Sequence, residues 1–581
     1  MARISRRLFV QQSALTPAAL YCRPKKLHVP VRMILSPFDT QRKMLSSLNI
    51  SAKTTVSGRK RIKSASQYIG LLAILLTSMG AASQDAHPQK PSPVAHVIPK
   101  AWDDNAIATL EVPLANPVGS PKHVSSDYYY RIPVPPIYRN YPVYAPDREP
   151  PGYTEWLKRQ EPVIKWNDSG TAPLLKTDED WIKAGAIVFD APVDLDRFVT
   201  AAEIEDPAWY KKTGTPVAAD GTIPFVRYVV RKKGTVEVGQ NSCAWCHTRV
   251  MPDGSILKGA QGNLPVVRAA AYSLRAAQAR DSEKLLARLR LRYRALWATP
   301  WLDPDPEAQI DQMSLEELIA AQEASPPGVV ARQRTSLLYP AQVPDLIGVK
   351  DRRYLDRTGL QQQSSIGDLM RYAAMNRGGF DGGDAVANHH GFIPADAPRF
   401  QELPDPATQG RYSDEQLYAL ALYVYSLQPP VTPNKFDALA EKGQQIFKRE
   451  NCVMCHTPPL YTNNKLTPAQ GFNIPEGHLK KYEILPMSVG TDSNLTLKTR
   501  RGTGYYKVPS LKGVWYRRMF GHSGWCAALE DWFDPRRTRD DYVPTGFKPF
   551  GVKTYAVKGH PFGLNLSEED RRALIAFLKT L

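Results

Sequence analysis

The first 63 residues of this 581-residue chain contain almost no acidic side chains: Asp39 is the only one, against 14 Lys and Arg. Beyond residue 63 the two signs nearly balance, with 61 basic and 56 acidic side chains. The formal charge of +18 therefore belongs mostly to one N-terminal segment. Because the remainder lacks a strong basic excess, the composition argues against a nucleic-acid partner for the folded part.

This basic leader also lacks an apolar run long enough for a membrane span. The run that begins at Ile69 is about a dozen residues long, against the roughly 20 that a span requires. It follows the basic run Arg59–Lys63 and precedes small residues, an order that predicts a secretory signal peptide cleaved near Ala82. An uncleaved anchor is the alternative. We expect translation to start near Met33 or Met44, and the protein to be periplasmic or otherwise exported, with no stable span after cleavage.

Proline is abundant in the next segment, with 15 prolines between residues 84 and 170. Such a stretch is not expected to form helix or central strand. Seven tyrosines between Tyr128 and Tyr153 give it more aromatic content than a free linker has. The segment therefore predicts an extended arm that lies on a folded core, with a peptide ligand for another protein as the alternative.

Cysteine is scarce, and four of the six cysteines lie in two Cys-x-x-Cys-His motifs. The motifs are Cys243-Ala-Trp-Cys246-His247 and Cys452-Val-Met-Cys455-His456. Two thiols three residues apart on a helical turn reach the two vinyl groups of a haem, and the adjacent histidine reaches the iron. The pattern predicts two covalently bound haem c groups.

Other chemistry fits a single Cys-x-x-Cys pair. A zinc half-site, a redox dithiol, or one zinc site built from all four cysteines are the alternatives. Export favours haem c over these readings. Cys526 has no cysteine partner in the exported chain, so we expect it to be a buried apolar residue.

The surroundings of the two motifs form an internal repeat, which a chance zinc site would not show. The offset between matching positions of the two halves falls from 209 residues at the motifs to 154 residues at the C-terminal end. The main matches are Gly185 with Gly443, Cys243 with Cys452, Val343–Val349 with Val508–Val514, and Ser413–Leu427 with Ser567–Leu581. Each half is therefore predicted to contain, in this order along the chain, a helix, a haem motif, a loop, a Pro-Leu turn and a second helix.

The repeat predicts a mainly α fold with two tandem cytochrome c-like haem domains. The expected organisation is a leader over residues 1–83, the arm over 84–175, the first domain over 176–430 and the second over 431–581. The first domain carries two inserts. Alternation over Phe225–Val236 predicts a small β-hairpin, and helical runs are expected around Ser282–Leu296 and Ser314–Ala321.

One difference between the halves predicts a division of labour between the haems. Where the second half has His522, the first half has Arg357. Because histidine binds iron and arginine does not, we expect a six-coordinate second haem, held by His456 and His522, and an open first haem at His247. The alternative role of His522 is a hydrogen bond to a haem propionate. Met519 and His560 are the competing iron ligands.

Charged side chains near the expected open haem are candidates for acid–base or charge-stabilising work. They are Arg352, Asp356 and Arg357, which follow the Pro-Leu segment of the first half. His389 and His390 are the other histidines of the first half downstream of its motif. We expect them to lie in a solvated, Gly-rich loop.

The arrangement over roughly residues 180–581 resembles the bacterial di-haem cytochrome c peroxidase superfamily. The resembling stretches are residues 184–190, both Cys-x-x-Cys-His motifs, Val508-Pro-Ser-Leu511, His522-Ser-Gly524 and Leu529-Glu-Asp531. The resemblance implies His247 as the proximal ligand of a reactive haem, His456 as that of a relay haem, and a calcium ion between the domains. Gly521 stands where these peroxidases have an axial methionine. This departure argues against the usual His-Met relay haem. The superfamily includes cofactor-maturing and rubber-oxygenase-like branches, and the wide motif spacing and the arm are closer to the oxygenase-like ones.

The sequence therefore predicts an exported di-haem oxidoreductase of the peroxidase type. Hydrogen peroxide would be reduced at the open haem, with electrons from a cytochrome or cupredoxin arriving through the second haem. Two alternatives stay open: a di-haem oxygenase that uses dioxygen to cleave an organic substrate, and a two-haem electron carrier without enzymatic activity.

Overall fold

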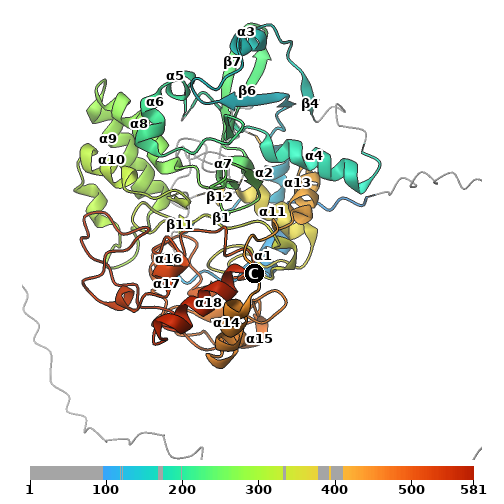
Figure 1. The fold of residues 1–581 in the computed structure, drawn as a ribbon. Helices are drawn as coiled ribbons and strands as arrows, with labels where there is room; N and C mark the ends of the chain where they lie inside the picture. The colour runs from blue at the N-terminus through green and yellow to red at the C-terminus, as the bar shows by residue number, and fades with distance from the viewer. Residues whose placement is uncertain are drawn as a thin grey trace, which may run out of the picture. The chain divides into compact units, whose positions relative to one another are not determined.

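The computed structural model describes residues 96–117, 120, 122–167, 175–197, 199–331, 335–376, 392–393 and 410–581. The expected leader and the pair His389 and His390 lie outside these residues. Lys90–Leu581 form one compact unit, drawn in colour where described in Figure 1. The boundary expected at residue 430 stays a prediction.

The first half is organised around two long helices that pack on each other, α4 (Asp178–Asp190) and α13 (Asp414–Ser426). Both begin at a capping box, set by Thr177 in α4 and Ser413 in α13, in which side chains satisfy the first free amides. A third helix, α11 (Ile366–Asn376), packs against α13. Together they bury the core that contains Trp181, Val188 and Leu417.

The second half repeats this helix pair with α14 (Ala438–Arg449) and α18 (Glu568–Lys579). In both pairs a glycine lets the backbones touch. A Cβ on Gly185 would lie 2.0 Å from the carbonyl oxygen of Ala419, and one on Gly443 would lie 1.9 Å from that of Ala573. The helices matched by the sequence repeat therefore cross in the same way.

Small antiparallel sheets accompany the helices, so the expected mainly α fold is corrected to a mixed α/β one. The predicted hairpin is confirmed: β6 (Thr222–Lys232) pairs with β7 (Thr235–Gln240). Edge strands β3 (Asn140–Tyr144) and β5 (Asp194–Leu195) complete a sheet of order β3-β6-β7-β5.

The described part of the chain also contains five two-stranded sheets. They are β1 (Lys122–His123) with β12 (Phe392–Ile393), β2 (Ile137–Tyr138) with β4 (Ile164–Trp166), β8 (Thr248–Val250) with β9 (Ile256–Lys258), β10 (Val329–Val330) with β11 (Ala341–Gln342), and β13 (Leu466–Pro468) with β14 (Tyr505–Lys507).

The helical insert of the first half is present as predicted. It contains α8 (Val266–Gln278), α9 (Ser282–Arg290), the π-helix η1 (Leu291–Trp297) and α10 (Leu315–Glu323), which form the group of light-green helices in Figure 1. Shorter elements are α5 (Ala201–Ile204), α6 (Pro207–Thr213), α7 (Cys243–Cys246), η2 (Ala308–Asp311), η3 (Val349–Asp351), η5 (Cys452–Met454), α15 (His478–Lys481), α16 (Asn494–Leu497), α17 (Leu529–Trp532) and η6 (Pro535–Thr538).

The Pro-rich arm differs from the expectation of a purely extended segment. Three short helices lie between its prolines: α1 (Asp104–Leu110), α2 (Ser126–Arg131) and α3 (Tyr153–Lys158). Each is at most seven residues long, which fits between successive helix-breaking prolines. Pro142 lies in β3, where an edge strand tolerates the missing amide.

The arm lies on the core of both halves, as its aromatic content predicted. Trp102 and Tyr129 stack with ring centroids 4.7 Å apart and are buried. The amide of Val112 donates to Leu360 O in the first half at 2.8 Å, and the amide of Ala115 donates to Gly502 O in the second at 2.8 Å. Backbone hydrogen bonds thus connect this segment to residues far along the chain.

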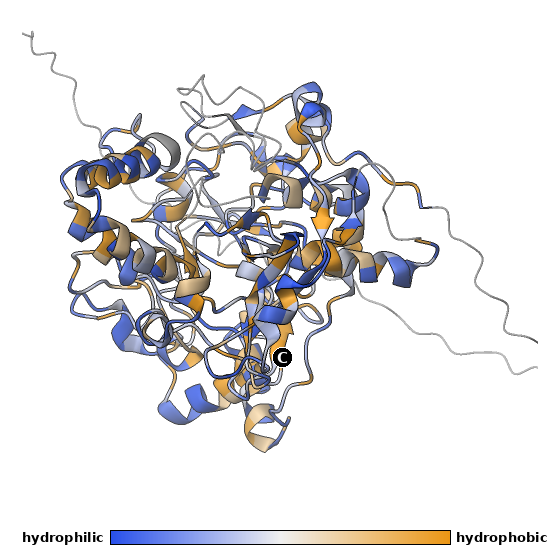
Figure 2. Ribbon diagram, turned by 90° about the horizontal axis from the view of Figure 1, so that it is seen from above, coloured by the Kyte–Doolittle hydropathy of each residue, from blue (hydrophilic) through white to orange (hydrophobic). Residues whose placement is uncertain are grey.

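The helices are amphipathic, and hydrophobic and hydrophilic residues alternate along them in Figure 2. In the described part of the chain, no helix is long and apolar enough to cross a membrane.

We expect Gly443→Ala to destabilise the protein by about 1–3 kcal/mol or more, because the new Cβ overlaps the backbone of Ala573. Chemical unfolding followed by circular dichroism measures the change. Gly367→Ala is the control, since its Cβ meets its nearest neighbour at an ordinary 3.5 Å. Equal free energies of unfolding for the two variants would contradict the proposed close contact.

Candidate functional site

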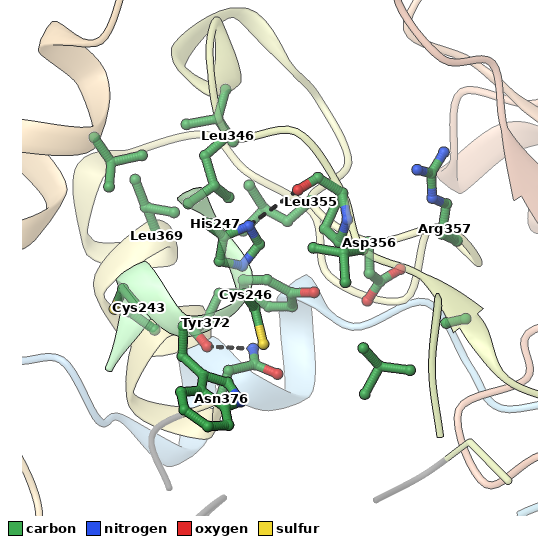
Figure 3. Close-up of a pocket in the computed structure, with 18 of the residues that line it drawn as sticks. Cys243, Cys246, His247, Leu346, Leu355, Asp356, Arg357, Leu369, Tyr372 and Asn376 are labelled. Atoms are coloured by element: carbon green, nitrogen blue, oxygen red, sulfur yellow. Dashed lines mark hydrogen bonds between the residues drawn. The ribbon is translucent and has the colours of Figure 1, made fainter. Parts of the chain in front are cut away.

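The first Cys-x-x-Cys-His motif lines a large cavity in the first half, shown in Figure 3. The space between the lining residues measures about 1660 Å³, including the part open to solvent. Strand β7 leads into α7, so Cys243 and Cys246 stand one helical turn apart at the cavity wall. Most of the wall is apolar and comes from α11, α13 and the Pro-Leu segment: Leu346, Val349, Leu355, Leu369, Leu420 and Val424.

His247 is held in one orientation at this cavity. Its Nδ1 lies 3.0 Å from the carbonyl oxygen of Pro344, and its backbone amide donates to Cys243 O at 2.9 Å. A carbonyl can only accept, so Nδ1 carries the proton and Nε2 keeps its lone pair. This is the tautomer that a histidine needs to bind a metal through Nε2.

The described lining of the first cavity offers no second histidine and no methionine opposite His247. Tyr372 and Tyr412 are the phenols there, and the amide group of Asn376 donates to Tyr372 O at 2.6 Å. Among the described residues, the wall therefore provides one imidazole for a metal. The expectation of an open site in the first half stays a prediction, since His389 and His390 lie outside the described residues.

The second motif lines a separate cavity of about 1420 Å³, counted in the same way. Helix α14 ends two residues before Asn451, whose φ of 57° turns the chain into η5. This turn presents Cys452 and Cys455 to the cavity. The wall is again mostly apolar, with residues from α14, α17 and α18: Phe447, Leu529, Trp532, Phe533, Leu574 and Leu578.

His456 occupies in the second cavity the place that His247 has in the first. Its Nδ1 lies 3.1 Å from the carbonyl oxygen of Tyr461. Burial lowers its pKa, which favours the neutral ring that binds metals. In both motif histidines Nδ1 therefore lies against a backbone carbonyl, which favours the tautomer that binds a metal through Nε2.

A second histidine, His560, faces His456 across this cavity. The two ring centroids are 6.3 Å apart. With metal–nitrogen bonds of about 2.0 Å and a ring centre about 1.1 Å behind each nitrogen, two axial imidazoles would be about 6 Å apart. Nδ1 of His560 is buried without a hydrogen-bond partner, and burial lowers its pKa to about 3, so the ring is neutral. If a haem is bound at His456, His560 is therefore the residue that would supply its second imidazole.

His522 also lines the second cavity, but both of its ring nitrogens are engaged. Nδ1 lies 3.0 Å from Ser523 Oγ, and Nε2 lies 3.2 Å from Asp492 Oδ2. Its ring stacks on Tyr506 with centroids 4.5 Å apart. Met519, the third ligand considered, is not part of the described cavity wall. This geometry favours His560 over His522 as the partner of His456.

The two cavities are neighbours that share Arg357. The amide of Gln342, in the wall of the first, donates to the carbonyl oxygen of His522, in the wall of the second, at 2.9 Å. Arg357, which replaces His522 in the sequence repeat, thus lines the same cavity as His522.

The three charged residues expected to act at the first haem have different surroundings. Asp356 lines the first cavity and pairs with Arg501 at 2.8 Å rather than with Arg357. Arg352 lies outside the first cavity, where its guanidinium donates to the backbone carbonyls of Asp345 and Ile347. Arg357 reaches the first cavity, and its Nε is buried without a hydrogen-bond partner.

A cluster of cations lies between the cavities, around a smaller polar space lined by Arg352, Arg357, Lys507 and Arg517. Asp345 is the carboxylate in that lining, 3.7 Å from Arg517. Burial and the charges of Arg517 and Arg352 lower the pKa of Arg357 to about 9. Burial and the neighbouring arginines also lower the pKa of Lys507 well below its usual range. The cluster therefore has a deficit of negative charge.

The shortage of negative charge shows whether a haem would suit this site. The residues present fit a haem. A haem carries two propionate carboxylates, which are the anions that unpaired buried guanidinium groups require. Each cavity is also lined by two thiols from one Cys-x-x-Cys turn and by the adjacent imidazole. Lys507 and Arg357 carried no sequence signal for this role, because only the fold brings them together.

The alternative metal and thiol chemistries fit less well. The two Cys pairs line different cavities, so they do not join in one zinc site. Within the described ranges, no three His, Cys, Asp or Glu side chains are grouped to hold a metal ion, and calcium stays a prediction. Burial raises the pKa of Cys452 to about 11, opposite to the lowered pKa of a nucleophilic dithiol.

Comparison with known proteins gives no family for this chain. No family model and no curated protein matches it. Two solved structures are similar to parts of it. Kuenenia stuttgartiensis hydrazine synthase, pressurised with xenon, has a TM-score of 0.27 and 15% identity over 45% of this chain and 79% of its own. A MauG-like protein associated with microbial copper homeostasis has a TM-score of 0.25 and 16% identity over 44% and 78%. These TM-scores are too low to carry an argument.

We expect the double variant Cys452→Ser/Cys455→Ser to lose one of two covalently bound haems, because its second cavity no longer offers thiols. A pyridine haemochrome assay on protein of known concentration counts them. Cys526→Ala is the control, because this buried cysteine lines neither cavity and should leave two haems in place. A wild-type count other than two would contradict the assignment.

Proposed function

We propose that this protein is an exported di-haem c-type oxidoreductase that reduces hydrogen peroxide in its first cavity, with electrons entering through its second cavity. Cys243, Cys246 and His247 would hold one haem, and Cys452, Cys455 and His456 the other. Bound there, the haems would supply an accessible iron for a small oxidant and a closed iron that only exchanges electrons.

One observation carries this proposal: the rings of His456 and His560 lie 6.3 Å apart in the second cavity, whereas His247 is the one histidine in the described lining of the first. Equal coordination in both cavities would suit an electron carrier. Unequal coordination suits an enzyme, in which one site takes a substrate and the other feeds it.

The residues of the first cavity support chemistry on a small polar oxidant. Arg357 brings a buried positive charge to an otherwise mostly apolar wall, where such a charge stabilises developing negative charge strongly. Asp356 is held by Arg501 and by the amide of Leu360, which donates to it at 2.9 Å. Asp356 therefore keeps Arg501 at the cavity wall rather than offering a free base. Arg352 would act from outside, by fixing the backbone beside Pro344.

Electrons would have a short path between the cavities. Tyr506 stacks on His522 in the second cavity and packs in one cluster with Leu495 and Ala341, which line the first. The hydrogen bond from Gln342 to His522 makes a second connection. A small electron-transfer protein, such as a cytochrome or cupredoxin, is the partner that this function requires.

The large apolar wall of the first cavity favours one second candidate, an oxygenase that uses dioxygen to cleave an organic substrate. An organic substrate would contact this apolar wall, whereas a peroxide is small and polar. Turnover assays separate the two activities.

We expect cyanide to bind one of the two ferric haems, because only the first cavity leaves a position free. Optical titration and EPR of the purified holoprotein measure this. Peroxide consumption with a reduced cytochrome as electron donor should follow, and His247→Ala should abolish it. Cyanide binding at neither haem would overturn the proposal in favour of a carrier. Cyanide binding without peroxide turnover would favour the oxygenase.

His560→Ala should convert the second haem from low-spin to high-spin, because it removes the imidazole that faces His456. His522→Ala is the matched control: it removes a histidine from the same wall, one that already bonds Ser523 and Asp492, and should leave the second haem low-spin. EPR spectra of both variants are compared with wild type. A loss of the low-spin signal in His522→Ala alone would assign the ligand to His522 instead.

A further inference from the structure

Arg537 is a fully buried arginine behind the wall of the second cavity. It lies in η6, between the cavity residue Trp532 and the C-terminal helix. Its guanidinium lies over the Trp532 ring, 4.8 Å from the centroid, and Nε donates to Trp532 O at 2.7 Å. Trp532 in turn lies 5.5 Å from the His560 ring, centroid to centroid.

The other donors of Arg537 all reach the turn that carries His560. Nη1 donates to the carbonyl oxygens of Val557 and Gly559, the latter at 2.9 Å. Nη2 donates to the carbonyl oxygen of His560 itself at 2.7 Å. The amide of Val557 returns a hydrogen bond to Arg537 O at 2.7 Å. One side chain thus binds most of the turn.

This turn has a conformation that needs such support. His560 has a φ of 55°, in the left-handed region that non-glycine residues rarely adopt. A Cβ on Gly559 would lie 2.6 Å from Cα of Thr491, so the turn also sits close against a neighbouring segment. The amide of His560 donates to Val489 O at 2.6 Å. Backbone contacts alone hold the turn from one side, and Arg537 holds it from the other.

The charge of Arg537 has no other evident use. Among the described residues it forms no ion pair with a carboxylate, and burial lowers its pKa. Burying an unpaired cation is costly unless hydrogen bonds compensate, and here four backbone carbonyls do so. A guanidinium has five N–H donors on three nitrogens and can therefore bond carbonyls that lie well apart. The ammonium of a lysine has all its donors on one nitrogen. The neighbouring Arg536, in contrast, pairs with Asp534 at 2.7 Å and its side chain is 79% exposed.

We propose that Arg537 is the positioning residue that keeps His560 in place as the second axial ligand of the second haem. The inference rests on the proposed function, because it assumes that His560 binds that haem. It assigns Arg537 a role through His560 and no contact with the haem. Loss of Arg537 should free the turn and leave the second haem partly without its sixth ligand.

The test compares holoprotein variants by EPR and by titration with cyanide. Arg537→Gln should convert part of the second haem to high-spin and tighten its cyanide binding by about 10- to 100-fold, the usual scale for loss of an outer-shell partner. Arg537→Lys, which keeps the charge and loses the fork, should show a smaller change in the same direction. Arg536→Gln is the control and should match wild type. Cyanide binding at the first haem and the far-UV circular dichroism report whether each variant is folded.

The outcomes separate this inference from the proposed function. A wild-type spectrum in folded Arg537→Gln, together with loss of the low-spin signal in His560→Ala, would overturn the positioning role and leave His560 as the ligand. An unchanged spectrum in His560→Ala would overturn both. Where the glutamine variant does not accumulate, the lysine variant carries the test, and a wild-type spectrum there would overturn the positioning role.

Discussion

Backbone contact between two helices in each half is the constraint on which both cavities depend. Gly185 and Gly443 let the first helix of each half touch the last one at a carbonyl group. In the second half, α14 leads directly to the motif, and α18 supplies Leu574 and Leu578 to the cavity wall. Because one helix sets the position of the thiols and the other closes the cavity, any larger residue at the glycine would move one relative to the other.

The parts of the fold that local patterns specify could be predicted from the sequence. The hairpin at Phe225–Val236, the insert helices and the repeated helix pairs follow from alternation, helical periodicity and internal similarity. The short helices of the arm could not be predicted, because they form between prolines only where aromatic residues such as Trp102 dock on the core. The sequence left His560 as one of three possible iron ligands, because it lies more than 100 residues after His456 and no spacing rule connects the two. Arg537 carried no sequence signal, because only the fold brings it to the turn that carries His560.

The two halves differ most where they meet. The sequence comparison set Arg357 against His522, and the structure brings both to the wall of the second cavity. The surplus of positive charge around Arg352, Lys507 and Arg517 lies between the cavities rather than inside either one. The repeated unit thus contains the Cys-x-x-Cys-His motif twice, whereas the cluster of cations occurs once among the described residues, between the two cavities.

The arm gives the molecule an assembly order. The side-chain amide of Asn116 donates to Leu497 O at 2.6 Å, across 381 positions of the chain. Because that carbonyl belongs to the second half, the arm cannot complete its docking until nearly the whole polypeptide has been made. The segment that leaves the ribosome early is therefore among the last to settle. Until then the surfaces that it covers, including those beside Leu360 and Gly502, stay exposed to solvent.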